Sequence, residues 1–95
     1  MAKFLVYHTL PTDLTFDQLE QMAEGAHADP NAKAYRAFLN LSKGKGVCAW
    51  EGPSSEGVAA RLRELEIPFD EIIAIEAEGD GVTVRKVETS ASHAR

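Results

Sequence analysis

The sequence predicts a single α+β domain in which short strands alternate with two helices. Residues 47–51 form an apolar run that leads directly into residues 52–55, Gly-Pro-Ser-Ser, as expected of a strand-to-helix junction. Serine oxygens accept hydrogen bonds from the unpaired first amides of a helix, and proline is tolerated in its first turn. Thr15 and Gln18 have the spacing of a capping box, which indicates the start of another helix.

The N-terminal part of the chain predicts a strand followed by a helix. Residues 4–10 are rich in β-forming side chains, and Pro-Thr-Asp at residues 11–13 ends this strand. Both faces of the strand are largely apolar, so we expect both to be covered. A helix is predicted at residues 16–28, where apolar residues recur at helical spacing before Asp-Pro-Asn at residues 29–31.

The middle of the chain predicts a hairpin and a second helix. Residues 35–41 and 47–51 are expected to be two strands joined by a flexible turn at residues 42–46. The second helix begins at Ser54 or Ser55. Its apolar side carries Val58, Leu62 and Leu65.

The C-terminal part predicts a fourth strand at residues 72–77 and a short strand at residues 82–87 behind a tight turn at Asp80 and Gly81. The complete order is β-α-β-β-α-β with a terminal β extension. This is the ferredoxin-like arrangement, an antiparallel sheet with both helices on one face. Because the other face is also apolar, we expect two copies to pair there as a homodimer, a dimeric α+β barrel.

Composition sets the class of protein. The 95 residues, 44% hydrophobic and 26% charged, suffice for one domain, predicted at residues 1–88 with a flexible tail at 89–95. A net charge of −5 argues against nucleic acid as a partner, and no apolar run is long enough for a membrane span. A single cysteine excludes an intramolecular disulfide, and with no recognisable signal peptide the cytoplasm is the expected compartment.

Three stretches resemble a family of small bacterial ferredoxin-like proteins classed as a domain of unknown function, some of whose members are described as nickel-binding. The stretches are residues 4–15, 48–56 and 65–72, and the middle one, Cys-Ala-Trp-Glu-Gly-Pro-Ser-Ser-Glu, is the most specific. The resemblance implies a ferredoxin-like fold, self-association and divalent-metal binding. The chain departs from the family at Tyr7-His8, where an acidic-basic pair is common, and in its C-terminal extension.

His8 and Cys48 are the leading candidates for a site. They lie on strands that are adjacent and antiparallel in this fold, so the two side chains converge if they share a face. Imidazole and thiolate suit nickel, zinc or copper, and Glu51, another histidine, water or a symmetry mate would complete the coordination. The structural alternative is that Cys48 is a small buried hydrophobe and His8 a hydrogen-bonded residue at a strand end.

The remaining candidates have simpler interpretations. His27 falls at the end of the first predicted helix, where positive charge is favoured, and His93 lies in the predicted tail. Gly-Lys-Gly at residues 44–46 lacks the rest of a phosphate-binding loop and is expected to be a turn. Tyr7 and Trp50 are candidate pocket-lining residues for a flat apolar ligand.

Three functional hypotheses follow. The first is a non-enzymatic, cytoplasmic homodimer that binds nickel or another divalent transition metal as a buffer or sensor. The second is a dimeric α+β barrel enzyme of monooxygenase or isomerase type, with Tyr7, His8 and Trp50 around a small organic substrate and His8 as acid or base. The third is a self-assembly module with no ligand. A closed core between sheet and helices would remove the second hypothesis.

Overall fold

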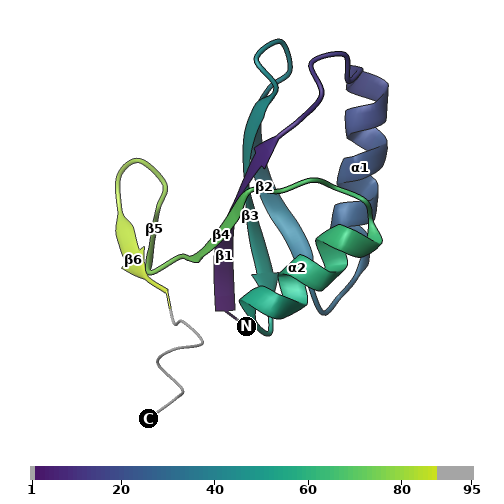
Figure 1. The fold of residues 1–95 in the computed structure, drawn as a ribbon. Helices are drawn as coiled ribbons and strands as arrows, with labels where there is room; N and C mark the ends of the chain where they lie inside the picture. Colours follow the sequence, from purple (N-terminus) through teal and green to yellow (C-terminus); the bar gives the residue numbers. More distant parts are fainter. Residues whose placement is uncertain (1, 88–95) are drawn as a thin grey trace.

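Four antiparallel strands form one sheet, and both helices cover the same face of it (Figure 1). The computed structural model describes residues 2–87, so the predicted tail at 89–95 and the domain limit at residue 88 lie outside the described residues. No helix in this part of the chain is long and apolar enough to cross a membrane. The elements are β1 (Ala2–Thr9), α1 (Phe16–Ala28), β2 (Lys33–Asn40), β3 (Lys45–Gly52), α2 (Ser55–Glu64), β4 (Glu71–Ala74), β5 (Ala77–Gly79) and β6 (Val84–Lys86).

This architecture confirms the predicted α+β class and the ferredoxin-like element order. The sheet has the order β2-β3-β1-β4, so the N-terminal strand lies inside it. One prediction was wrong, because residues 72–77 do not form one strand. β4 ends at Ala74, where the chain passes to the separate β5-β6 sheet. The Ile75 amide still donates to the Lys3 carbonyl at 2.9 Å, whereas the Glu76 carbonyl accepts from the Val87 amide at 2.9 Å.

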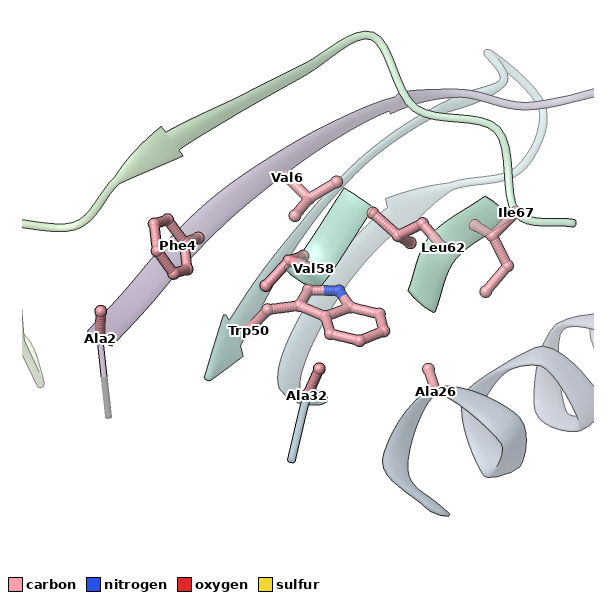
Figure 2. Packing of buried hydrophobic residues seen from close by; sticks show 9 residues of the cluster. All are labelled: Ala2, Phe4, Val6, Ala26, Ala32, Trp50, Val58, Leu62 and Ile67. Carbon is pink, nitrogen blue, oxygen red and sulfur yellow. The ribbon is translucent and has the colours of Figure 1, made fainter. Parts of the chain in front are cut away.

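The core lies between the sheet and the helices. Side chains alternate along β1, so every second residue from Ala2 to His8 is buried against the helices. Trp50 of β3 and Val58 and Leu62 of α2 pack in the same cluster, as Figure 2 shows. Each fully buried aliphatic side chain of this kind contributes about 1.5–3 kcal/mol to stability.

α1 is well capped but shallowly packed. The Thr15 hydroxyl accepts from the Gln18 amide at 3.1 Å, and the Gln18 side-chain oxygen accepts from the Thr15 amide at 2.9 Å, which completes the predicted capping box. Ala26 is the one buried residue of the helix, while Leu19 and Met22 are partly buried. The helix therefore contributes little large apolar area to the core.

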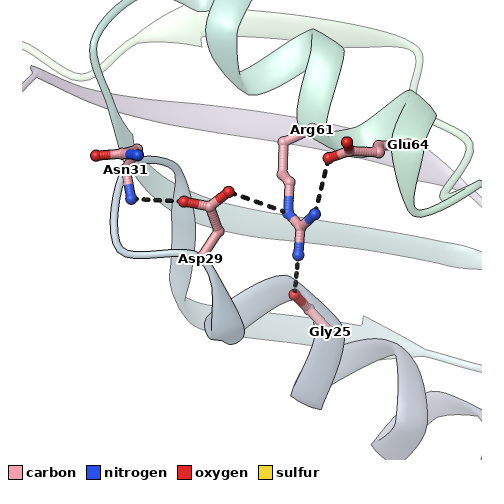
Figure 3. Close-up of polar contacts among 5 residues, drawn as sticks. All are labelled: Gly25, Asp29, Asn31, Arg61 and Glu64. Atoms are coloured by element: carbon pink, nitrogen blue, oxygen red, sulfur yellow. Dashed lines mark hydrogen bonds and ion pairs between the residues drawn. The ribbon is translucent and has the colours of Figure 1, made fainter.

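Arg61 of α2 fastens the C-terminal end of α1 (Figure 3). Its Nη2 atom donates to the Gly25 carbonyl at 3.1 Å, and its Nε atom lies 3.9 Å from the Asp29 carboxylate. The Glu64 carboxylate accepts from Nη1 at 2.8 Å and holds the guanidinium in place. One charged side chain thus satisfies a helix-end carbonyl and links the two helices.

The end of α2 reverses the chain toward β1. Glu66 has a φ of 58°, the left-handed conformation that follows many helices. Its amide donates to the Arg63 carbonyl at 3.0 Å, and the Ile67 amide donates to the Leu62 carbonyl at 2.9 Å. This Schellman motif, which ends at Ile67, directs the chain back toward the sheet. The carbonyl of the following residue, Pro68, then reaches His8 on β1.

The face of the sheet opposite the helices is open. Alternation and strand register place Leu5, Tyr7, Phe38, Val47 and Ile73 there. Phe38 is 62% exposed, Ile73 40% and Tyr7 38%. Large apolar side chains are therefore gathered on one surface that the helices do not cover.

Glu78 anchors the β5-β6 hairpin beside this open face. Its carboxylate accepts from the Lys3 ammonium at 2.7 Å and from the Tyr35 hydroxyl. The hydrogen bonds from Lys3 and Tyr35 hold the pKa of Glu78 below its ordinary value. Burial, together with the hydrogen bond to Glu78, raises the pKa of Tyr35. The hairpin is thus joined to two strands of the main sheet by polar contacts.

Candidate functional site

A cavity of about 290 Å³ lies between α1 and the helix-facing side of the sheet. Small side chains leave this space: Ala23 and Ala26 on the helix, and Ala34 and Ala37 on β2. Larger apolar side chains also line it, among them Leu10, Leu19, Met22, Leu39, Leu62 and Ile67, together with the polar residues His27, Tyr35 and Arg36. The helix and sheet are therefore not sealed against each other, as a fully packed core would require.

His8 is the most deeply buried ionisable residue of this cavity. It is 4% exposed, and its Nδ1 atom lies 2.7 Å from the Pro68 carbonyl oxygen. A carbonyl only accepts, so Nδ1 carries the proton and Nε2 of the neutral ring is an acceptor. Nε2 is buried and has no hydrogen-bond partner within the described residues.

The orientation of the His8 ring follows from the strand order. Pro68 lies in the segment that enters β4, and β4 and β3 flank β1 on opposite sides. His8 lines the cavity, but its Nε2 atom is itself buried, so the ring meets the cavity through its other atoms. The bond to Pro68 holds the unpaired acceptor in a fixed direction.

Cys48 lies on the same face of the sheet as His8. Val6 pairs with Cys48 and His8 with Gly46, so Cys48 and His8 are diagonal neighbours, and both line the cavity. Burial raises the pKa of the Cys48 thiol to about 11. The thiol is therefore neutral at physiological pH unless a bound cation displaces its proton.

The other three predicted site residues lie on different faces of the sheet: Glu51 and Tyr7 on the open face, and Trp50 on the helix-facing side. Glu51 pairs with Lys3 on the open face, so it drops out of the ligand set that a single protomer can assemble around His8 and Cys48. Tyr7 also faces the open side and does not line this cavity, whereas Trp50 does. The enzyme hypothesis needs Tyr7, His8 and Trp50 in one pocket, but His8 shares this cavity with Trp50 and a separate surface pocket with Tyr7.

His27 lies at the rim of the cavity. It occupies the last turn of α1, as predicted, and its Nδ1 atom lies 2.9 Å from the Ala34 carbonyl oxygen of β2. His27 thus links the helix to the edge of the sheet. His93 lies outside the described residues. Only Gly44 of the Gly-Lys-Gly stretch lies in the turn, at a φ of +66° and with the Leu10 carbonyl where a side chain would be. Lys45 and Gly46, which were expected in the turn, are the first residues of β3.

Two features of the site were not predicted from the sequence. The first is the Pro68 carbonyl, for which residue types give no signal. The second is the α1 wall of the cavity, for which the repeated alanines Ala23 and Ala26 were an available signal, because small residues on the inward side of a helix leave volume unfilled.

A family model described as nickel responsive protein SCO4226-like matches residues 4–75. The chain belongs to this family. The crystal structure of SCO4226 from Streptomyces coelicolor A3(2) is similar, with 27% sequence identity and a TM-score of 0.72 over 82% of this chain and 100% of that chain. No curated protein matches the chain. The resemblance predicted from the sequence is thereby confirmed, and the β5-β6 hairpin lies beyond the SCO4226-like match.

The donors in the cavity fit a transition metal ion in part. Histidines that bind metals commonly donate their other ring N–H to a carbonyl, which is the arrangement of His8. Within residues 2–87, however, no three His, Cys, Asp or Glu side chains are grouped so as to hold an ion. One protomer of this SCO4226-like protein therefore offers two donors, and other ligands would have to complete the coordination.

Proposed function

We propose that this protein binds nickel, as a buffer or sensor in the cytoplasm, with His8 Nε2 as the anchoring ligand and Cys48 as its neighbour. The observation that carries the proposal is the buried Nε2 atom of His8, which has no hydrogen-bond partner within the described residues and belongs to a ring that Nδ1 orients beside the cavity. The description of the SCO4226-like family as nickel responsive supports the choice of metal.

The chemistry of the two donors sets how binding would depend on pH. His8 binds through a neutral ring nitrogen, and Cys48 binds as a thiolate after it loses a proton whose pKa is about 11. A bound divalent cation would stabilise this thiolate. Binding therefore releases a proton, and affinity is expected to weaken as the pH falls.

We also propose that two copies pair through their open sheet faces. The exposed apolar side chains of that face support this, because contiguous apolar surface is rarely left in water. The remaining nickel ligands are water molecules, because the two donors of one chain are too few and a copy paired on the open face lies across the sheet from His8 and Cys48.

The test uses tag-free full-length protein titrated with Ni²⁺ in a calorimeter. His8→Asn is the informative variant, because its amide N–H occupies the position of Nδ1–H and preserves the bond to Pro68 while Nε2 is removed. We expect His8→Asn to weaken nickel binding more than about tenfold. Cys48→Ser should weaken binding and abolish the proton release.

His27→Gln and His93→Gln are the matched controls, since together with His8 they are the three histidines of the chain. Both should bind nickel like the wild type, and Mg²⁺ should not bind because it prefers oxygen ligands. If nickel affinity depended on His27 or His93 and not on His8, the proposed centre would be wrong.

A further inference from the structure

The apolar side of α1 is only partly covered by the rest of the protein. Leu19 and Met22 are partly buried, and Ala26 is the one buried residue of the helix. The facing strand β2 presents the small side chains of Ala34 and Ala37 toward the helix. Because protein cores are normally close-packed, the cavity is apolar volume that the side chains of the chain leave unfilled.

Two polar residues of the lining direct their polar ends to the other side of the sheet. Arg36 pairs with Ala49 on the open face, and its guanidinium carbon lies 5.6 Å from the centroid of the Phe38 ring. The Tyr35 hydroxyl donates to the Glu78 carboxylate beside that face. Both residues therefore meet the cavity through atoms other than the guanidinium and the hydroxyl.

The two buried rings of the lining also present little polarity to the cavity. His8 Nε2 and Trp50 Nε1 are both buried and without a hydrogen-bond partner within the described residues. An atom that faced a space large enough for water would be accessible to it, so both nitrogens are turned into the packed core. Polar contact is left to the rim, where the exposed His27 ring donates from Nδ1 to the Ala34 carbonyl.

The size of the cavity limits what can enter. An apolar cavity of about 150 Å³ stays dry and holds one benzene molecule, and the volume here is about 290 Å³. This is the lower end of the range for small-molecule sites. The occupant is therefore a compact molecule and not a peptide or a nucleotide.

We infer that this cavity binds a compact, uncharged apolar molecule of roughly ten carbon atoms, which packs between α1 and the sheet and completes the core there. The inference does not rest on nickel binding, since it concerns hydrocarbon contacts in the metal-free protein. It adds to the chain a site for a hydrophobic ligand, formed by α1, β1, β2 and β3.

Trp50 provides the measurement, because it is the single tryptophan of the chain and lines the cavity. The full-length protein is kept in EDTA at pH 8 and titrated with toluene, butylbenzene and hexylbenzene. We expect a saturable change in Trp50 fluorescence and an affinity that rises about fourfold for each methylene between toluene and butylbenzene. Hexylbenzene exceeds the volume and should bind no more tightly than butylbenzene.

Three outcomes of this series would overturn the inference. They are the absence of a saturable change, equal affinities of toluene and butylbenzene, and an affinity that keeps rising to hexylbenzene, which would show adsorption to apolar surface in general.

A charged analogue tests the apolar character of the lining. 4-Phenylbutyrate has a carboxylate in place of the terminal methyl group of butylbenzene. It should bind at least about tenfold more weakly, because a carboxylate loses its hydration against hydrocarbon walls. Equal or tighter binding of 4-phenylbutyrate would show that a cation of the lining attracts the ligand, and would contradict the assignment.

Two variants of α1 test the location. Ala23→Leu enlarges a side chain of the lining and should weaken butylbenzene binding about tenfold or more, whereas Ala28→Leu changes the same helix outside the lining and should leave binding unchanged. Circular dichroism checks that both are folded. Butylbenzene should also slow hydrogen exchange of the α1 amides in the wild type, since it fills the space beneath this helix. Equal effects of the two substitutions, or unchanged exchange in α1, would contradict the site.

Discussion

At the scale of single residues, His8 is held in one orientation by a carbonyl far along the chain. Its partner, Pro68, is 60 residues away and reaches β1 only because Glu66 adopts a left-handed conformation. No local pattern in the sequence predicts that contact. Alternation along a strand, by contrast, was predictive: Glu51 is three residues from Cys48, an odd separation, and so belongs on the opposite face.

The Cys48 thiol is expected to react slowly in the folded protein. Burial raises its pKa from an ordinary value of 9.0 to about 11. At pH 8 this lowers the thiolate fraction, and hence the alkylation rate, about a hundredfold relative to the unfolded chain. Iodoacetamide labelling followed by mass spectrometry, with and without urea, measures the ratio. Comparable rates in both states would contradict the proposed burial of the sulfur.

Glu66 has a backbone conformation that glycine adopts more easily than glutamate does. A non-glycine residue at a φ of 58° carries a steric cost that glycine avoids. Glu66→Gly should therefore stabilise the protein by about 1 kcal/mol, because the Schellman bonds are made by the backbone and are retained. Urea unfolding followed by Trp50 fluorescence measures this. Ala60→Gly, at an exposed position inside α2, is the control and should destabilise.

At the scale of the elements, residue patterns correctly predicted the helices and strands whose ends are marked by neighbouring residues in the sequence. The capping box at Thr15 and Gln18 gave α1 its correct start, and Asp-Pro-Asn gave its end. The division between β4 and β5 was missed because Ile72, Ile73 and Ile75 favour a strand that continues across Ala74, whereas the break depends on which neighbouring strand accepts each backbone bond. The cavity was missed for a related reason, as it depends on how far α1 stands from the sheet.

The contacts through which Glu78 holds the β5-β6 hairpin are expected to weaken in acid. The pKa of Glu78 is below its ordinary value of 4.5 in the folded protein, chiefly because Lys3 donates to the carboxylate. Its stabilisation is therefore present above pH 4.5 and lost as the pH falls through the folded value. Glu78→Gln should lower stability by about 1 kcal/mol at pH 7 and by less in acid.

Urea unfolding of wild type and Glu78→Gln from pH 7 to pH 3 checks this expectation. The two proteins should converge in stability as the carboxyl group of the wild type becomes protonated. Asp17→Asn is a matched control on α1, away from the hairpin. A stability difference between wild type and Glu78→Gln that stays constant with pH would show that the charge of Glu78 is not what holds the hairpin.

At the scale of the whole molecule, the two faces of the sheet have different roles. One face carries the helices and the cavity, while the other is open and apolar. From the sequence, both faces of β1 were recognisable as apolar, which predicted a covered sheet. We propose that a second copy of the chain covers the other face.

Two phenylalanines with similar exposure allow a matched test of that dimer. Phe38 on the open face is 62% exposed, and Phe16 on α1 is 65% exposed. Phe38→Glu places a charge in the proposed interface and should convert a dimer into a monomer, while Phe16→Glu should not. Sedimentation equilibrium measures the masses. A wild-type monomer, or a dimer that both variants retain, would contradict pairing through the open face.

The inside position of β1 has a consequence during synthesis on the ribosome. This strand emerges first, yet it pairs with β3 and β4, so its edges have no partners in the sheet until residues 45–52 and 71–74 have been made. The His8 ring is oriented only once Pro68 has left the exit tunnel. A nascent chain consequently gains the geometry of the candidate site late, when nearly the whole domain has been translated.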